Sequence, residues 1–160
     1  MDQSRRDAVM LAMAAIFAPA AANAQTPWRR TPWIRKAEFM KDSEQHDMRS
    51  FESIHHGIGK INVKFFRFDG APAPANYLIY DIPPGSSEGT HVHRLNDEKL
   101  GSFDEYYYMI SGSGVMEIDD QIVQVAPGDH VFTPLDVRHG IENTSKSENL
   151  KVFLTFILRS

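Results

Sequence analysis

The 160-residue chain contains no cysteine. This absence excludes disulfide bonds and thiolate metal sites, so any bound metal ion must be held by nitrogen and oxygen ligands. The chain is also short of positive charge, with 17 Lys and Arg residues against 21 Asp and Glu residues and a formal net charge of -4. Such a balance argues against a nucleic-acid-binding protein. The length and the hydrophobic fraction of 42% fit one globular domain with its own core.

A long apolar run occurs near the N-terminus, where residues 8–22 follow Arg5 and Arg6. A small-x-small cleavage site follows at residues 22–24. We therefore expect residues 1–24 to be an export signal, too short for a membrane span, and the mature protein to be periplasmic or secreted without stable membrane insertion. The paired arginines resemble a twin-arginine signal, although the usual Phe and Leu are absent. An ordinary secretory signal is the alternative.

Residues 25–57 have the composition of an N-terminal arm and loop. A Thr-Pro-Trp repeat places Trp28 and Trp33 in an extended segment. We expect both rings to pack on the domain or on a second subunit. A basic patch for an anionic surface, made by the neighbouring Arg and Lys residues, is the alternative. Residues 41–50 are polar and predict a short helical turn or loop.

Residues 58–160 predict a series of short β-strands. Runs of β-branched and aromatic residues are separated by turn signals of Gly, Pro and Asp. The predicted strands are residues 61–68, 77–82, a segment near 91, 105–111, 115–118, 122–125, 130–133, 139–143 and 150–158. The glycine-rich residues 112–114 predict a hairpin turn. Many short strands with almost no helical periodicity indicate an all-β sandwich or barrel.

Three histidines and one glutamate have spacings that suit a single metal ion. Side chains alternate faces along a strand, so His91 and His93 point to the same side. Glu105 opens a strand that can pair next to them, and His139 comes from a more distant strand. These side chains meet only if the sheet curls as a small barrel does. The sequence therefore predicts a metal site that these four residues form.

The same residues resemble the cupin superfamily. The first cupin motif, G-x5-H-x-H-x3,4-E-x6-G, is matched in order by Gly85, His91, His93, Glu105 and Gly112. The second motif, G-x5-P-x-G-x2-H-x3-N, is matched by Gly128, Pro134, His139 and Asn143. The resemblance implies a small single-domain monocupin, with an all-β cupin-type barrel of the jelly-roll (double-stranded β-helix) kind. It also implies a homodimer, for which the arm that carries Trp28 and Trp33 is a candidate contact.

The chain departs from the first motif between His93 and Glu105, where eleven residues replace the usual three or four. Glu98 satisfies the spacing from His93 but lies in a charged stretch typical of a solvated loop. Glu105 satisfies the spacing to the last glycine of the motif and leads into a strand, so we assign it as the ligand. Residues 94–103 are then an inserted loop, either a lid or an exposed spacer. In the second motif Asp136 replaces a glycine, and aspartate tolerates turn conformations.

The resemblance implies one divalent transition metal ion. Iron or manganese is favoured if the ion is loaded before a twin-arginine export step, and copper, nickel and zinc are the alternatives. Coordination positions left open beside the ion would accept a small-molecule substrate. We expect a metal-dependent dioxygenase acting on a small oxygenated or aromatic compound. A redox-neutral isomerase, epimerase or lyase and a non-enzymatic metal- or ligand-binding protein are the alternatives.

Five further residues are not assigned as metal ligands. Alternation places Tyr107 on the same side as the glutamate ligand, so its phenol is a candidate for orienting substrate or donating a proton. Core packing with a hydrogen-bonded hydroxyl is the alternative. Arg138 is expected to point away from the ion. His55, His56 and His130 lie outside both motifs and are expected to be structural or exposed.

Overall fold

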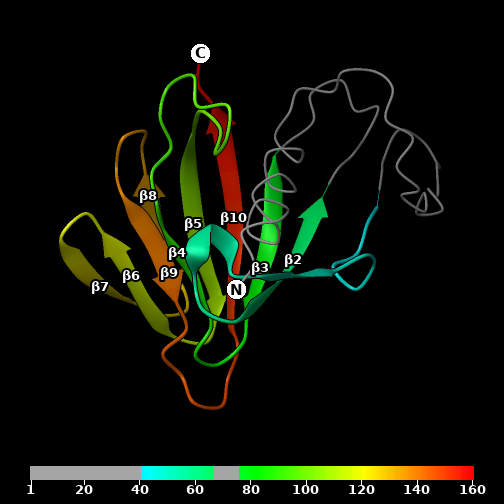
Figure 1. Ribbon diagram of the computed structural model, residues 1–160. Helices are drawn as coiled ribbons and strands as arrows, with labels where there is room; N and C mark the ends of the chain where they lie inside the picture. The colour runs from blue at the N-terminus through cyan, green and yellow to red at the C-terminus, as the bar shows by residue number, and fades with distance from the viewer. Residues whose placement is uncertain (1–40, 67–75) are drawn as a thin grey trace, which may run out of the picture.

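The computed structural model describes residues 41–66 and 76–160. The predicted export signal, Trp28 and Trp33 lie outside the described residues. Two antiparallel sheets make up the fold (Figure 1), one of six strands in the order β1-β2-β3-β10-β5-β8 and one of four in the order β4-β9-β6-β7. Within the described ranges, no helix has the length and apolar character needed to cross a membrane.

Residues 41–66 and 76–160 form ten strands and one short 3-10 helix, and most of the strands are short, as the sequence predicts. They are β1 (Arg49–Glu52), η1 (Ile54–His56), β2 (Lys60–Phe66), β3 (Tyr77–Ile82), β4 (Ser87–His91), β5 (Phe103–Ser111), β6 (Gly114–Ile118), β7 (Gln121–Val125), β8 (His130–Thr133), β9 (His139–Glu142) and β10 (Leu150–Leu158). All nine predicted strands are present, and their ends within the described residues differ from the prediction by a few residues at most. The predicted end of the first strand, at residues 67–68, lies outside the described residues. The predicted all-β fold is confirmed.

Strand β1 is present but not predicted. The sequence predicts a helical turn or loop over residues 41–50, and this prediction is wrong at residues 49–50, where β1 begins. β1 pairs antiparallel with β2 and extends the large sheet. Phe51 contacts Phe65 of β2 edge to face, with ring centroids 6.3 Å apart. A four-residue edge strand with polar side chains on one face carries too little hydrophobic pattern to be recognised alone.

The prediction of a hairpin at residues 112–114 is also wrong, because β5 and β6 belong to different sheets. The chain crosses here from the large sheet to the small one. Gly112 has a φ of 78°, and a Cβ at this position would lie 2.3 Å from the carbonyl oxygen of Asn149. The glycine is needed both for the backbone conformation and for this close approach. Turn residues predict that the chain changes direction, but they do not predict which sheet the following strand joins.

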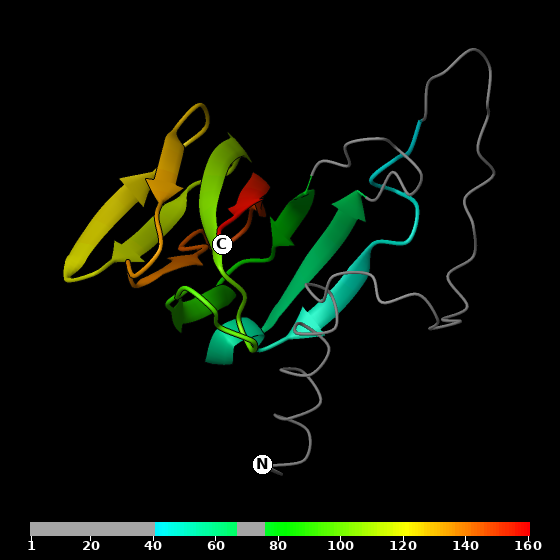
Figure 2. The same cartoon turned by 90° about the horizontal axis from the view of Figure 1, so that it is seen from above.

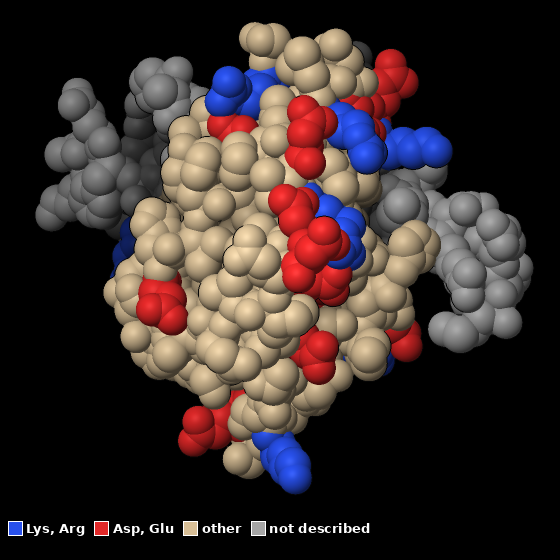
Figure 3. Space-filling view, turned by 90° about the vertical axis from the view of Figure 1, so that its left-hand side faces the viewer, with Lys and Arg blue, Asp and Glu red and all other residues tan. Residues whose placement is uncertain are grey.

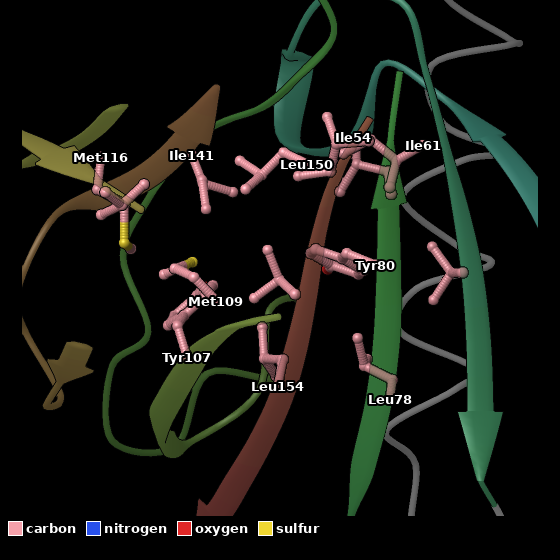
Figure 4. Close-up of a cluster of buried hydrophobic side chains, with 14 residues drawn as sticks. Ile54, Ile61, Leu78, Tyr80, Tyr107, Met109, Met116, Ile141, Leu150 and Leu154 are labelled. Atoms are coloured by element: carbon pink, nitrogen blue, oxygen red, sulfur yellow. The ribbon is translucent and has the colours of Figure 1, made fainter. Parts of the chain in front are cut away.

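Buried apolar side chains from both sheets meet between them (Figure 4). Met116 of β6 and Ile141 of β9 lie on one side of this core. Tyr107 and Met109 of β5 and Leu154 of β10 lie on the other side. Alternation along β5 points Tyr107 and Met109 inward, as predicted, because residues two apart share a face. The core therefore fixes the face of β5 that also carries Glu105.

The two sheets do not cover each other fully. Viewed from above, β1 and β2 lie at the far edge of the large sheet, away from β6 and β7 (Figure 2). The opposite side of the molecule, where β6, β7 and β8 lie, shows acidic and basic side chains next to one another (Figure 3). That face thus has mixed charge, in keeping with the nearly balanced composition.

Candidate metal centre

The four predicted ligands come together between the two sheets. His91 ends β4, His139 begins β9, and the two residues pair across the small sheet. His93 follows His91 by two residues, and Glu105 lies in β5 of the large sheet. All four are buried, with exposed fractions from 1% to 7%. Segments far apart in the sequence thus place three imidazoles and one carboxylate in a single interior position.

Their ligand atoms all lie within 4.8 Å of one another. The Nε2 atoms of His91 and His93 are 3.1 Å apart, and the Nε2 of His93 is 3.3 Å from Glu105 Oε2. The same oxygen lies 4.0 Å from His91 Nε2 and 2.6 Å from His139 Nε2. Donors about 2.1 Å from one ion are about 3.0 Å apart at right angles and about 4.2 Å apart when opposite. Except for the shorter hydrogen bond between Glu105 and His139, the separations suit ligands of one ion.

The second ring nitrogen of each histidine is held by a backbone carbonyl. The Nδ1 partners are the oxygens of Gly89 for His91 at 3.0 Å, of Gly101 for His93 at 3.3 Å and of Val137 for His139 at 3.0 Å. A carbonyl only accepts, so each Nδ1 donates, and Nε2 is left as the nitrogen that faces the centre. The Nε2 atoms of His91 and His93 face each other at 3.1 Å, so the space between them suits a proton or a cation. The donor set therefore fits a metal ion.

The electrostatics of the cluster favour a cation as well. Burial raises the pKa of the Glu105 carboxyl, but hydrogen bonds with His139 and His93 outweigh burial and hold this pKa well below its usual range. Burial lowers the pKa of His91 well below its ordinary value, so its imidazole stays neutral. Burial also lowers the pKa of His139, but the hydrogen bond with Glu105 and its charge outweigh burial and raise it. A buried carboxylate is thus compensated by protons that a metal ion can replace.

Tyr107 lies beside the carboxylate, on the face that alternation predicts. Its hydroxyl donates a hydrogen bond to Glu105 Oε2 at 3.0 Å and lies 3.4 Å from Glu88 Oε2. The side chain is fully buried, and burial raises its pKa well above the ordinary value. The hydroxyl is therefore held neutral against the carboxylate of Glu105. A role in orienting substrate or donating a proton stays a prediction.

Replacing Tyr107 with phenylalanine is expected to weaken Mn²⁺ binding by about tenfold, the effect typical of losing an outer hydrogen bond to a ligand. The ring stays, so the core keeps its packing. Isothermal titration of the metal-free protein with Mn²⁺ measures the change. Tyr106→Phe is the matched control, because Tyr106 lies on the opposite face of β5 against Phe132. Equal affinities for the Tyr107→Phe variant and the wild type would contradict a role for this hydroxyl in orienting Glu105.

Glu88 is a buried carboxyl near the centre that the motifs do not contain. It is 3% exposed and accepts a hydrogen bond from the Tyr80 hydroxyl at 3.0 Å. Burial and then the charge of Glu105 raise the pKa of Glu88 to about 8. Alternation alone places a residue three positions before His91 on the opposite face. The pairing of β4 with β9 shifts register between Glu88 and His91, and this irregularity lets both side chains be buried.

His55 is the second group that lacked a predicted role at the site. The sequence predicts a structural or exposed residue, and the structure agrees with the first alternative. The His55 ring is buried and stacked on that of His91, with centroids 3.7 Å apart. Its Nε2 lies 3.8 Å from Glu88 Oε1. No spacing rule links a residue in η1 to the motifs, so the sequence gives no signal for this contact.

The predicted inserted loop at residues 94–103, whose last residue Phe103 is the first residue of β5, supports one of the histidines. The carbonyl of Gly101 accepts the hydrogen bond from His93 Nδ1, and the ring of Phe103 packs on the His93 ring with centroids 3.9 Å apart. Glu98 is exposed in this loop and is not among the four clustered side chains. The loop therefore does more than separate two strands, while a lid function stays a prediction.

The remaining predictions on single residues agree with the structure. Arg138 points outward and forms an ion pair with Glu117 at 2.6 Å. His56 and His130 are exposed. Asp136 takes a φ of 67°, the left-handed conformation for which the family motif has glycine.

Comparison with known proteins gives a consistent picture. Residues 78–156 match the family model of the cupin domain, Cupin_2. The chain is 39% identical over 67 residues to the oxalate-binding protein of Thermotoga maritima, covering 42% of this chain and 50% of that protein. It is 32% identical over 62 residues to an uncharacterised protein of Methanocaldococcus jannaschii, covering 39% and 44% of the two chains. The matched part thus spans about half the length of these curated relatives.

Solved structures extend the likeness to most of the chain. A crystal structure of a predicted oxalate decarboxylase from Thermotoga maritima superposes with a TM-score of 0.61 at 26% identity, over 70% of this chain and 92% of that chain. A Cupin 2 conserved barrel domain protein from Salinispora arenicola gives a TM-score of 0.58 at 17% identity, over 76% and 89% of the two chains. The second likeness concerns the fold alone.

Proposed function

We propose, from the premise that this chain carries a cupin domain with the cupin β-barrel fold, that it is a metal-binding cupin for small oxygen-rich acids of the oxalate kind. The proposed ligands of the ion are His91, His93, Glu105 and His139. One observation carries the proposal. Three buried imidazoles each donate a hydrogen bond from Nδ1 to a backbone carbonyl, and their Nε2 atoms face one buried carboxylate. A hydrogen bond from the second ring nitrogen commonly orients histidine ligands of metal ions.

The choice of an oxygen-rich acid follows from the donor set. When bound, a divalent transition ion supplies positive charge and, in the case of iron or manganese, redox reactivity. Four protein ligands leave two positions of an octahedral ion for other molecules. Oxalate, with oxygen atoms on adjacent carbons, can fill two neighbouring positions. The oxalate-binding protein and the solved predicted oxalate decarboxylase, both from Thermotoga maritima, support the same class of compound.

Oxalate is expected to bind only to the metal-loaded protein. In isothermal titration, the full chain loaded with Mn²⁺ should bind oxalate at least about tenfold more tightly than acetate, because a second coordinating oxygen adds about 1.4 kcal/mol or more. Removal of the metal with a chelator should abolish the signal. Equal binding of oxalate before and after metal removal would count against the proposed function.

The metal and the reaction type are further parts of the proposal. Affinity order alone favours copper and zinc in such a site, so iron or manganese requires loading before export. Elemental analysis of protein purified from its native compartment tests this point. The dioxygenase activity expected from the sequence predicts oxygen uptake that depends on iron or copper. Turnover under strict anaerobiosis, or activity retained with zinc or nickel, would instead support redox-neutral chemistry.

We also propose that the mature protein is exported and forms a homodimer. The candidate signal at residues 1–24 supports export, and the motif resemblance supports the homodimer. N-terminal sequencing of the exported protein and sedimentation of the purified protein test the two points separately.

A further inference from the structure

The short helix η1 packs directly on the strand that ends in His91 (Figures 1 and 2). Its contact with β4 brings backbone against backbone. A Cβ on Gly57 would lie 2.0 Å from the carbonyl oxygen of Ser87, and a Cβ on Gly89 would lie 2.0 Å from the carbonyl oxygen of His55. Only glycine allows so close an approach. The segment around His55 therefore packs closely against β4, at the residues that precede the proposed ligand His91.

Hydrogen bonds close this contact at its C-terminal end. The amide of Ile58 donates to Ser87 Oγ at 2.8 Å, and the amide of Ser87 donates to the carbonyl oxygen of Ile58 at 2.8 Å. The ladder between β4 and β9 is irregular between Glu88 and His91. Packing by η1 thus supports β4 in the region where its pairing with β9 is irregular.

The backbone of this segment is strained in a way that turns one histidine inward. Ser53, His55 and His56 have φ angles of 55°, 48° and 65°, which non-glycine residues rarely adopt. Such conformations persist only where the surrounding structure holds them. The result is that the ring of His55 is buried while that of its neighbour His56 is exposed.

The buried ring lies face to face with a proposed ligand. The rings of His55 and His91 have centroids 3.7 Å apart and an interplanar angle of 18°. Among the described residues, His55 Nδ1 has no hydrogen-bond partner, and its Nε2 is 3.8 Å from Glu88, beyond hydrogen-bonding distance. Stacking is therefore the close specific contact that this imidazole makes at the centre.

We propose that His55 is a positioning residue, whose ring holds the ring of His91 in the plane that directs Nε2 at the other three ligands. The hydrogen bond from Nδ1 to Gly89 fixes one edge of the His91 ring, and the stacked ring restricts rotation about its last side-chain bond. A preorganised ligand loses less conformational freedom when the ion binds. This inference rests on the proposed ligand set.

Co²⁺ titration of the full chain, followed by visible absorption, tests the role of His55. The His55→Ala variant should bind Co²⁺ about 10- to 100-fold more weakly and change the ligand-field spectrum of the bound ion. The His55→Phe variant, which keeps a flat ring for stacking, should retain the wild-type spectrum and an affinity within a few-fold of wild type. The His56→Ala variant is the matched control in the same strained segment and should behave as wild type.

Several results would overturn the inference. They are a wild-type affinity and spectrum in the His55→Ala variant, an equal loss in the His56→Ala variant, and a failure of phenylalanine to restore either property. Thermal unfolding of each metal-free variant separates loss of fold from loss of positioning, and the phenylalanine variant remains decisive if alanine unfolds the chain. A wild-type protein that binds no Co²⁺ would overturn the proposed ligand set itself, and this inference with it.

Discussion

Replacing Glu105 with glutamine is expected to weaken Mn²⁺ binding by more than about a hundredfold, above the range typical of an outer-shell change. Glu105 supplies the one carboxylate among the four clustered side chains, and its Oε2 lies within 4.0 Å of all three histidine Nε2 atoms. Glutamine has nearly the same shape but lacks the negative charge that a divalent ion needs beside neutral imidazoles. Competition with a coloured chelator measures the affinity.

Glu98→Gln is the control that makes this test specific. Glu98 stands at the usual family distance from His93, whereas Glu105 stands seven residues further along the chain. The structure exposes Glu98 in the inserted loop and buries Glu105 at the cluster. Metal affinity should therefore be unchanged in the Glu98→Gln variant. A larger loss in that variant than in Glu105→Gln would contradict the assignment and require the loop to fold over the site.

The clustering of His91, His93, Glu105 and His139 was predictable because it depends on simple rules. Strand alternation predicts that His91 and His93 face the same side, and they do, although His93 lies two residues beyond the end of β4. A strand that begins near Glu105 brings the carboxylate to the same interior. The strands themselves follow from β-branched and aromatic runs between turn residues. Family spacing then joins two segments that no local rule connects. The prediction succeeds where regular geometry and a known motif both apply.

Glu88 and His55 could not be predicted, because each depends on an irregularity. The register shift between β4 and β9 lets Glu88 be buried, against the facing that alternation assigns to it. The ring of His55 reaches the centre through left-handed backbone and through contacts across Gly57 and Gly89. The same limit explains the missed strand β1 and the wrong hairpin at residues 112–114. Sequence patterns report periodicity, whereas these features depend on which distant segment packs nearby.

Asn143 shows that a motif residue near a proposed metal ligand can serve the fold instead. It is fully buried just after β9, and its Nδ2 donates hydrogen bonds to the carbonyl oxygens of Ile82 and Glu148, both at 2.8 Å. Its Oδ1 accepts a hydrogen bond from the amide of Ser145 at 2.9 Å. The side chain thus ties the end of β3 to the loop that leads from β9 into β10.

Replacing Asn143 with alanine is therefore expected to lower the free energy of unfolding by about 2 kcal/mol. The buried carbonyl of Ile82 loses its partner at a cost of about 1 kcal/mol or more, and the part-buried backbone groups of Ser145 and Glu148 each lose a hydrogen bond worth about 0.5 kcal/mol. Urea denaturation of the metal-free protein measures this loss. Asn149→Ala is the control, because its one side-chain hydrogen bond, to Asp81 at 3.0 Å, is exposed and should contribute at most about 0.5 kcal/mol. Metal affinity of the folded Asn143→Ala variant should stay near that of wild type, because Asn143 is not one of the clustered ligands. Unchanged stability combined with lost metal binding would instead assign this residue to the metal centre, and the two readouts together decide between those roles.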